Sequence, residues 1–148
     1  MVWRGRPLVT EQPATLLAFD YGEASIGVAV GQTLTCTANP LGCVRVKQHR
    51  PQWHLIDQFI STWQPDALVV GVPVHMDGSE QPMTHAARRF MKKLEQRFSL
   101  PVHASDERLS TREAQSRLEE LNRPHDSDDP IAAQIILEGW LANQGSTP

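Results

Sequence analysis

The sequence predicts an α/β fold: a mixed five-stranded sheet, its first three strands antiparallel, flanked by helices. Three observations predict it. Two short apolar runs within residues 16–30, separated by a Gly-containing turn, are typical of a β-hairpin. The continuous apolar run at residues 67–72 is typical of a central strand covered on both faces. From there on, strand patterns alternate with helix patterns, which indicates parallel crossovers.

The first half of the chain contains the antiparallel part. After the hairpin, a third strand is expected within residues 34–41, and the polar stretch 45–51 is expected to be a loop. Apolar residues then recur at helical spacing, which predicts a helix from Pro51 to about Gln64, with the proline in its first turn.

The second half supplies the alternating elements. Helical periodicity marks residues 87–98, and a short strand is expected at 101–104. The capping-box pattern at 110–113 predicts a helix that starts near Thr111. A last helix is expected over about 130–143. The predicted order is therefore β-β-β-α-β-α-β-α-α.

Length and composition limit the possible classes. The 148 residues suit a single domain, 1–148, with residues 1–13 as a loose tail. No run reaches the roughly 18 apolar residues of a membrane span, and no signal peptide is recognisable. The protein is therefore expected to be cytoplasmic and not to associate with a membrane. Cys36 and Cys43 fit neither a disulfide framework nor a zinc pattern. The oligomeric state stays open.

The charge distribution is uneven. Residues 84–123 hold nine basic and six acidic residues, whereas 124–148 hold four acidic residues and no Lys or Arg. Nucleic-acid binding proteins usually carry a basic surface, because neutralised phosphates supply most of their non-specific affinity. The composition alone does not indicate that the protein binds RNA or DNA.

Acidic residues at the ends of the predicted strands are the main candidates for chemistry. Asp20 ends an otherwise apolar strand, where a carboxylate needs a hydrogen bond, a counter-charge or a metal. Asp106 and Glu107 follow the strand at 101–104, and Asp129 precedes the last helix. Each also has an ordinary structural explanation: a turn for Asp20, a solvated loop for the pair, and a helix N-cap for Asp129.

Considered together, these acidic residues predict a metal site. Ligands of α/β sheets gather at the carboxyl ends of the parallel strands, where Asp20, Glu107 and Asp129 are expected to meet. Three converging carboxylates repel one another unless a cation neutralises them. Mg²⁺ and Mn²⁺ prefer oxygen ligands, and such sites assist displacement at phosphorus. Basic residues of the predicted second and third helices are either a solvated face or phosphate contacts.

Four segments resemble the bacterial YqgF family of pre-16S rRNA nucleases, also described as Holliday-junction-resolvase-like proteins. They are FDYGEASIGVAVG (19–31), VVGVPVHMDGSEQP (69–82), DERLSTREA (106–114) and DPIAAQIILEGWL (129–141). The resemblance runs from about residue 16 to residue 141. It implies a ribonuclease-H-like fold and a metal-dependent endonuclease that processes the 5′ end of pre-16S rRNA.

The resemblance also implies roles for particular residues. The Asp of the family's first motif corresponds to Asp20, the acid of its DERxST motif to Glu107, and the Asp that opens its last helix to Asp129. These three would hold one or two Mg²⁺ or Mn²⁺ ions. The residues expected to position the nucleic-acid strand are Arg88, Lys92, Arg108 and Arg112.

The chain departs from the family at two places. Ser25 stands where a basic residue is frequent, and the loop before Asp129 reads NRPHDSDD where Lys and Arg are frequent. Both differences remove positive charge near the expected substrate. Three alternatives therefore stay open: a branched-DNA resolvase, a non-catalytic nucleic-acid-binding factor of ribosome assembly or transcription, and a phosphate-handling protein related to sugar kinases and actin.

Overall fold

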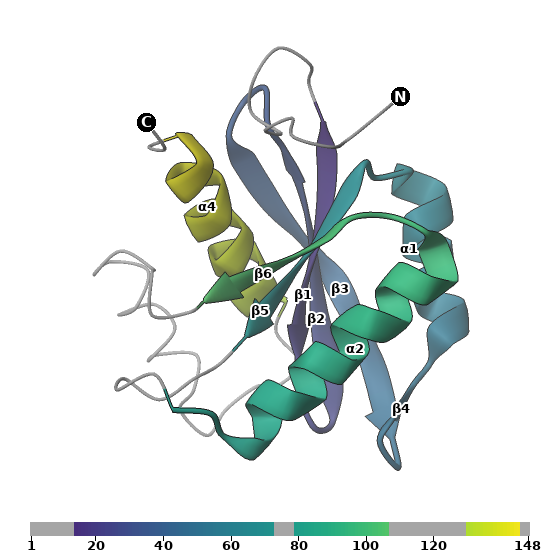
Figure 1. Ribbon diagram of the computed structural model, residues 1–148. Helices are drawn as coiled ribbons and strands as arrows, with labels where there is room; N and C mark the ends of the chain where they lie inside the picture. Colours follow the sequence, from purple (N-terminus) through teal and green to yellow (C-terminus); the bar gives the residue numbers. More distant parts are fainter. Residues whose placement is uncertain (1–13, 73–78, 107–129, 146–148) are drawn as a thin grey trace.

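The computed structural model describes residues 14–72, 79–106 and 130–145, which form a mixed sheet with helices on both faces (Figure 1). The strands are β1 (Thr15–Tyr21), β2 (Ser25–Gln32), β3 (Thr37–Lys47), β4 (Arg50–Pro51), β5 (Ala67–Val72) and β6 (Val102–Asp106). The helices are α1 (Trp53–Trp63), α2 (Pro82–Phe98) and α4 (Ile131–Gly145). Within these ranges no helix combines the length and the apolar character needed to cross a membrane.

The strand order confirms the predicted sheet. It reads β4-β3-β2-β1-β5-β6, and within the group β1 to β4 each strand pairs antiparallel with the next. β5 lies parallel to β1 on one side and to β6 on the other. All six residues of β5 are buried, as expected of a central strand covered on both faces. The sheet has six strands rather than the expected five, because the two-residue β4 joins its edge.

The extra strand corrects the prediction for residues 45–51, which was a polar loop leading into a helix. Instead β3 continues to Lys47, and a two-residue turn returns the chain to β4, where Pro51 pairs with Val46. The turn residues Gln48 and His49 have φ of 51° and 64°. Hairpin turns with two positive φ values usually contain Gly, Asn or Asp, so this sequence gave no turn signal. Helix α1 therefore begins at Trp53 and not at Pro51.

The remaining elements lie close to their predicted positions. Helix α2 begins at Pro82, five residues before the first apolar position of the predicted helix. A capping box fixes this start: the Gln81 backbone N–H donates to the Thr84 hydroxyl over 3.0 Å. Helix α4 matches the predicted last helix to within two residues at each end. The helix expected from Thr111 and the expected tail, 1–13, lie outside the described residues.

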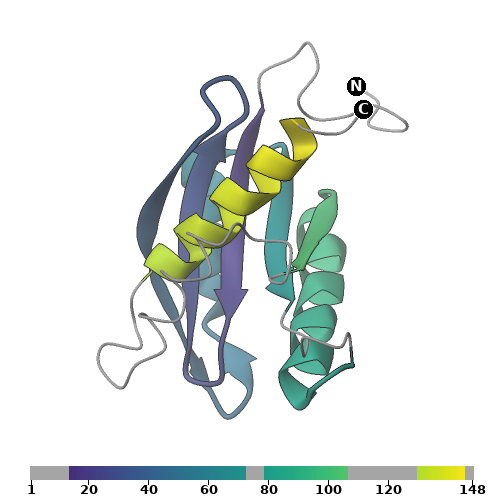
Figure 2. The ribbon, with the colours of Figure 1, turned by 90° about the vertical axis from the view of Figure 1, so that its left-hand side faces the viewer.

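Side chains of alternate residues in each strand enter two separate cores. Leu17 and Phe19 of β1 belong to the core beneath α1 and α2. Leu16 and Ala18 belong to the core beneath α4, which crosses this face (Figure 2). Because side chains in a strand alternate between the faces, Asp20 belongs to the α4 face and Tyr21 to the face of α1 and α2.

Candidate active site at the carboxyl ends of the parallel strands

The candidate site lies where three parallel strands end together. β1, β5 and β6 run in the same direction, so their carboxyl ends share one edge of the sheet (Figure 1). Phe19 of β1 is paired with Val70, and Gly71 with Ser105. Asp20, the residue after Phe19, is therefore level with Gly71 and Ser105 at this edge. Ligands of α/β sheets are bound at such an edge.

Small neighbours surround Asp20 on the α4 face. In β5, Val69 belongs to the core beneath α4, so Gly71 faces the same way as Asp20. A Cβ atom on Gly71 would lie 2.5 Å from Cδ1 of Ile136, so α4 rests directly on this glycine. The close approach of α4 covers the carboxyl end of β1 on one side and leaves Asp20 partly buried.

The Asp20 carboxylate has no counter-charge among the described residues. None of them donates a hydrogen bond to it or forms an ion pair with it. Burial raises the pKa of Asp20 to about 6, because desolvation disfavours the charged form. At pH 7 and above the group is nevertheless mostly ionised. A partly buried carboxylate that lacks a positive partner fits a hard divalent cation, which prefers oxygen ligands.

The other two expected ligands cannot be placed. Glu107 and Asp129 lie outside the described residues, as do Arg108 and Arg112. Asp106 is the last residue of β6, and Glu107 follows it in the sequence. Asp129 precedes Pro130, which is followed by the first residue of α4. In the part of the chain that the structure describes, no three His, Cys, Asp or Glu residues gather into a metal site.

The basic face of α2 is divided by its ion pairs. Arg88 pairs with Glu80, which also contacts His85 at 3.2 Å, at the start of the helix. Arg97, near the other end, makes a two-point hydrogen bond to Asp57 of α1, with distances of 2.9 and 2.7 Å. Lys92 is exposed. Arg88 and Lys92, both expected to contact the substrate, thus point outward, and Arg97 joins two helices.

A pocket that the sequence did not predict lies on the opposite side of β1 from Asp20. It has a volume of about 160 Å³ and lies between α2 and the β3–β4 hairpin. Its lining consists of Tyr21, His49, Pro51, Ala86, Arg89, Phe90 and Lys93. In the sequence, only the position of Tyr21 beside Asp20 could have indicated this pocket. The hairpin residues reach it through the turn at 48–49, which the sequence did not predict.

One partly buried histidine, His103, has a structural explanation. The His103 ring packs against Trp140 of α4, with 5.1 Å between ring centroids. Its Nε2 atom is buried and has no hydrogen-bond partner among the described residues. Burial lowers the pKa of His103, so the ring is neutral at pH 7 and packs as an apolar group.

Comparison with known proteins confirms the resemblance noted in the sequence. The family model RuvX, described as Holliday junction resolvase, matches residues 14–143. A protein of Haemophilus ducreyi is 48% identical over 135 residues, which cover 87% of this chain and 96% of the relative. One of Saccharophagus degradans is 44% identical over 138 residues, covering 90% and 97%. Both are named "Putative pre-16S rRNA nuclease".

The fold is also that of solved resolvases. RuvC of Thermus thermophilus, in a complex with a Holliday junction, superposes with a TM-score of 0.57 at 14% identity. The match covers 90% of this chain and 97% of RuvC, which confirms the ribonuclease-H-like fold. A second Thermus thermophilus RuvC structure gives a TM-score of 0.51. The chain belongs to the RuvX family, a family of nucleases that hydrolyse phosphodiester bonds.

Proposed function

We propose that this protein is a cytoplasmic, metal-dependent endonuclease that processes the 5′ end of pre-16S rRNA. The observation that carries the proposal is the Asp20 carboxylate, partly buried at the shared edge of three parallel strands without a positive partner among the described residues. The names of the relatives support pre-16S rRNA as the substrate.

We propose Asp20, Glu107 and Asp129 as the ligands of one or two Mg²⁺ or Mn²⁺ ions. Glu107 is proposed because it directly follows the last residue of β6, the strand that ends at this edge of the sheet, and because it corresponds to the acid of the family's DERxST motif. Asp129 is proposed because it directly precedes Pro130 and the first residue of α4, the helix that covers this face.

The role of the protein's own residues in this reaction would be to supply charged metal ligands at a fixed place. The rigid backbone of β1 fixes Asp20 at the sheet edge, and its ionised carboxylate supplies oxygen ligands. A bound Mg²⁺ or Mn²⁺ ion would activate water and stabilise charge on the leaving oxygen. In the hydrolysis a water oxygen bonds to phosphorus and the bond from phosphorus to O3′ breaks. The products are a 5′-phosphate and a 3′-hydroxyl, and the proton of the water passes to the 3′ oxygen or the solvent.

Four basic residues are proposed to hold the strand: Arg88, Lys92, Arg108 and Arg112. Arg88 and Lys92 are exposed one helical turn apart on α2, where they can meet successive phosphates. Their contribution would be electrostatic and independent of sequence, so it should weaken as the salt concentration rises. Arg88 would exchange its ion pair with Glu80 for a phosphate.

The test is a cleavage assay of precursor rRNA with Mn²⁺ or Mg²⁺. We expect Asp20→Asn to lower the single-turnover rate by roughly a thousand-fold or more, because the variant loses a charged ligand. Asp66→Asn is the matched control. Asp66 lies at the opposite end of β5, and its carboxylate accepts a hydrogen bond from the Thr15 N–H, which an asparagine can also do. The control should cut at the wild-type rate.

Two outcomes would contradict the proposal. Equal cleavage by wild type and Asp20→Asn would show that Asp20 is no part of the site. Absence of cleavage, with no binding of Mn²⁺ that depends on Asp20, would favour the non-catalytic binding factor. A four-way DNA junction belongs in the same assay, because the family model is described as Holliday junction resolvase and the RuvC structure holds a junction. Faster cleavage of the junction than of RNA would favour the resolvase.

A further inference from the structure

The pocket beside Tyr21 has the dimensions and the lining of a nucleotide site. Its volume of about 160 Å³ is close to the roughly 150 Å³ of a cavity that admits one benzene ring. Tyr21 and Phe90 supply an aromatic floor, with their ring centroids 5.1 Å apart, and Pro51 adds an apolar wall. Bases of single-stranded nucleic acids stack on such aromatic side chains.

The walls of the pocket are cationic. Arg89 and Lys93 lie one turn apart on α2, and His49 faces them from the turn between β3 and β4. Neither Arg89 nor Lys93 makes an ion pair with any residue in the described ranges. On the same helix, Arg88 and Arg97 are paired with acidic residues. The two basic side chains that line the pocket therefore have no acidic partner among the described residues and can contact phosphates.

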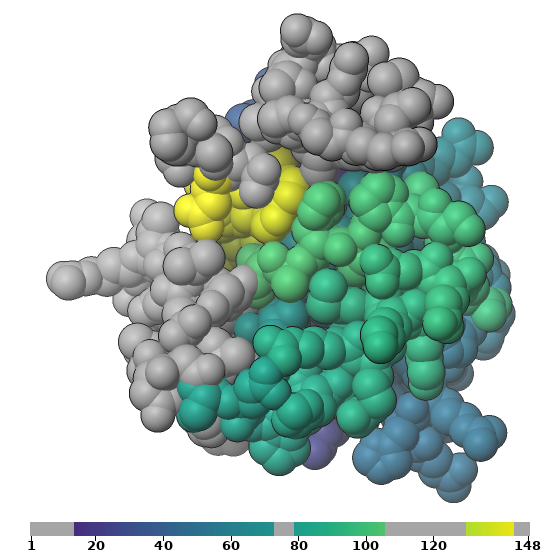
Figure 3. All heavy atoms as spheres, viewed as in Figure 1, coloured from purple at the N-terminus to yellow at the C-terminus, as the bar shows by residue number. Residues whose placement is uncertain are grey.

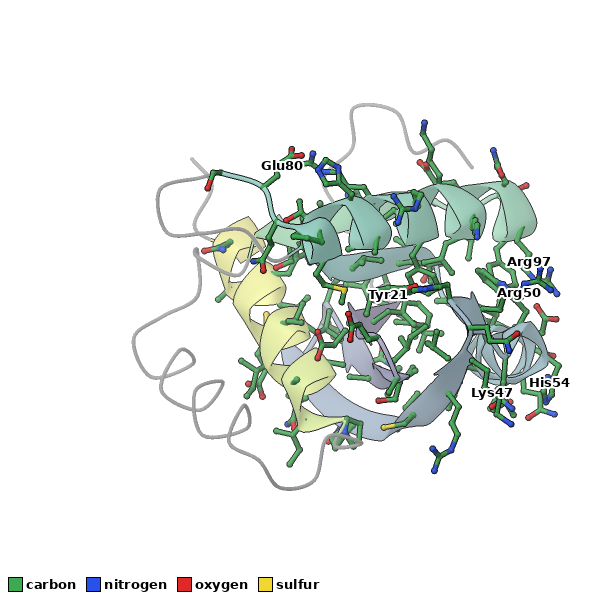
Figure 4. All side chains as sticks on the ribbon, turned by 90° about the horizontal axis from the view of Figure 1, so that it is seen from below. Tyr21, Lys47, Arg50, His54, Glu80 and Arg97 are labelled. Carbon is green, nitrogen blue, oxygen red and sulfur yellow. The ribbon has the colours of Figure 1, made fainter. Side chains whose placement is uncertain are left out.

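The positive surface continues along the hairpin. Lys47 and Arg50 are paired across its end and are exposed. The hairpin projects beside α2 on the molecular surface (Figure 3). Viewed from below, Lys47, Arg50 and Arg97 lie on one side of the molecule, Glu80 lies toward the opposite end of α2, and Tyr21 lies between them (Figure 4). The lining of the pocket itself contains Arg89, Lys93 and His49 and no acidic residue.

The position of the pocket links it to the proposed active site. Tyr21 follows Asp20 directly in β1, and the two side chains belong to opposite faces of the sheet. A nucleic-acid strand whose scissile phosphate meets Asp20 could therefore pass across the carboxyl end of β1 and reach the pocket with a neighbouring nucleotide.

We propose that this pocket binds one unstacked nucleotide of the substrate, so that the protein requires a single strand next to the cleavage site. The base stacks against Tyr21, and the adjoining phosphates contact Arg89, Lys93 and His49. A base within a duplex cannot enter, because it is stacked between its neighbours. The inference rests on the proposed nuclease function and specifies its substrate class as nucleic acid that is single-stranded at the cleavage site.

The test measures binding without cleavage. Fluorescence anisotropy in EDTA would compare a short labelled single-stranded RNA, the same RNA as a duplex, and a four-way DNA junction. We expect Arg89→Ala/Lys93→Ala to weaken single-strand binding and to lower the slope of log affinity against log salt by about 1.4, which is about 0.7 for each lost phosphate contact. Arg88→Ala/Lys92→Ala removes the same charges from the neighbouring stripe of α2, which is proposed to contact phosphates of any strand, so it should weaken single-strand and duplex binding by the same factor. Arg89→Ala/Lys93→Ala should instead weaken single-strand binding more than duplex binding.

A second pair of variants tests the stacking. Tyr21→Ala should weaken single-strand binding roughly 5- to 100-fold, whereas Tyr21→Phe, which keeps the ring, should bind as wild type does. The Arg89 and Lys93 side chains are exposed, so their variant decides the question even if Tyr21→Ala is unstable. The proposal would be overturned if Arg89→Ala/Lys93→Ala weakened single-strand and duplex binding by the same factor, or if wild type bound duplex and single strand with equal affinity.

The nuclease proposal is tested separately by cleavage with Mn²⁺. If wild type fails to cut but binds single strands through Arg89 and Lys93, the nuclease function is refuted and the pocket stands. If wild type cuts and Arg89→Ala/Lys93→Ala keeps the full preference for single strands over duplex, the pocket proposal is refuted and the nuclease stands.

Discussion

The two faces of the sheet are packed by different kinds of side chain. Beneath α1 and α2 the core contains large aromatic residues: the Phe90 ring lies 5.7 Å from those of Phe19 and Trp53 and 5.1 Å from that of Tyr21. Beneath α4 the sheet contributes mainly small residues, among them Ala18, Ala38, Ala67 and the glycines 31 and 71.

This difference separates two tasks. Large rings fill the space beneath α2, and the pocket lies between that helix and the hairpin. Small residues let α4 lie directly on the sheet, next to the carboxyl end of β1, where Asp20 becomes desolvated. We infer that one face is built to hold a strand of nucleic acid and the other to hold a charged group at a fixed place.

The strongest test of this contrast is Phe90→Ala. Truncation of a buried ring that touches three other rings should lower the free energy of unfolding by about 3–5 kcal/mol. Phe90→Leu, which keeps most of the volume, should cost less than about 1.5 kcal/mol. Urea unfolding measures both. Similar small losses would mean that the aromatic cluster does not dominate this face.

The next test concerns the cost of charge on the α4 face. Because the folded-state pKa of about 6 exceeds the ordinary 3.8, the native state binds the Asp20 proton more tightly than the unfolded state does. The associated stability is complete below about pH 3.8 and is lost as the pH rises through about 6. In metal-free buffer, Asp20→Asn should therefore be more stable than wild type by up to about 3 kcal/mol at pH 7.

The difference in stability between wild type and Asp20→Asn should disappear at acidic pH and decrease on addition of metal. Near pH 4 the wild-type carboxyl is protonated and the two stabilities should converge. Mn²⁺ at pH 7 should raise the melting temperature of wild type more than that of the variant, because it binds the ionised carboxylate. A gap that is constant between pH 4 and pH 7 would refute desolvation of Asp20 as its cause.

A smaller effect is expected from a methyl group on the α4 face. In Gly31→Ala the new Cβ would lie 2.6 Å from Cδ2 of Leu137 and 3.0 Å from the Thr37 carbonyl oxygen, so the Leu137 side chain of α4 and the backbone of β3 must both give way. We expect a loss of about 1–3 kcal/mol. Gly139→Ala is the control on α4 itself, since no described atom beyond the adjacent residues and backbone of this helix lies within 4 Å of the added Cβ. It should stabilise by up to about 1 kcal/mol through helix propensity.

Thermal unfolding in a calorimeter distinguishes these two glycine variants. The expected signs are opposite, which controls for a general effect of alanine. If Gly31→Ala is as stable as wild type, α4 does not need the close approach that the small residues allow, and the contrast between the two faces is weaker than we infer.

The sequence predicted those features that depend on local pattern. The apolar run of β5 requires burial on both faces, and the structure places the strand between α2 and α4. Asp20 was singled out because a carboxylate at the end of an apolar strand needs a partner. Glu107 and Asp129 remain predictions, because they lie outside the described residues.

Prediction from the sequence failed where tertiary contacts hold the conformation. Nothing in Gln48 and His49 indicates a turn, because side chains other than Gly, Asn and Asp seldom adopt two positive φ values in succession. The turn is held by β3, by β4 and by the hydrogen bond from the Gln52 N–H to the Arg45 carbonyl oxygen. The pocket beside Tyr21 could not be predicted either, because its residues come from three separate elements.

By itself the sequence determined the fold class, the order of the described elements other than β4, and the acidic residue at the end of β1, because strand and helix periodicity and the cost of a buried charge act over a few neighbouring residues. Only the tertiary structure decided which basic residues of α2 are free for a ligand and which are bound to acidic partners. Arg88 and Arg89 are adjacent in the sequence, yet one pairs with Glu80 and the other lines the pocket. The physical reason is that successive residues of a helix point about 100° apart, so the packing of the helix decides what each one meets.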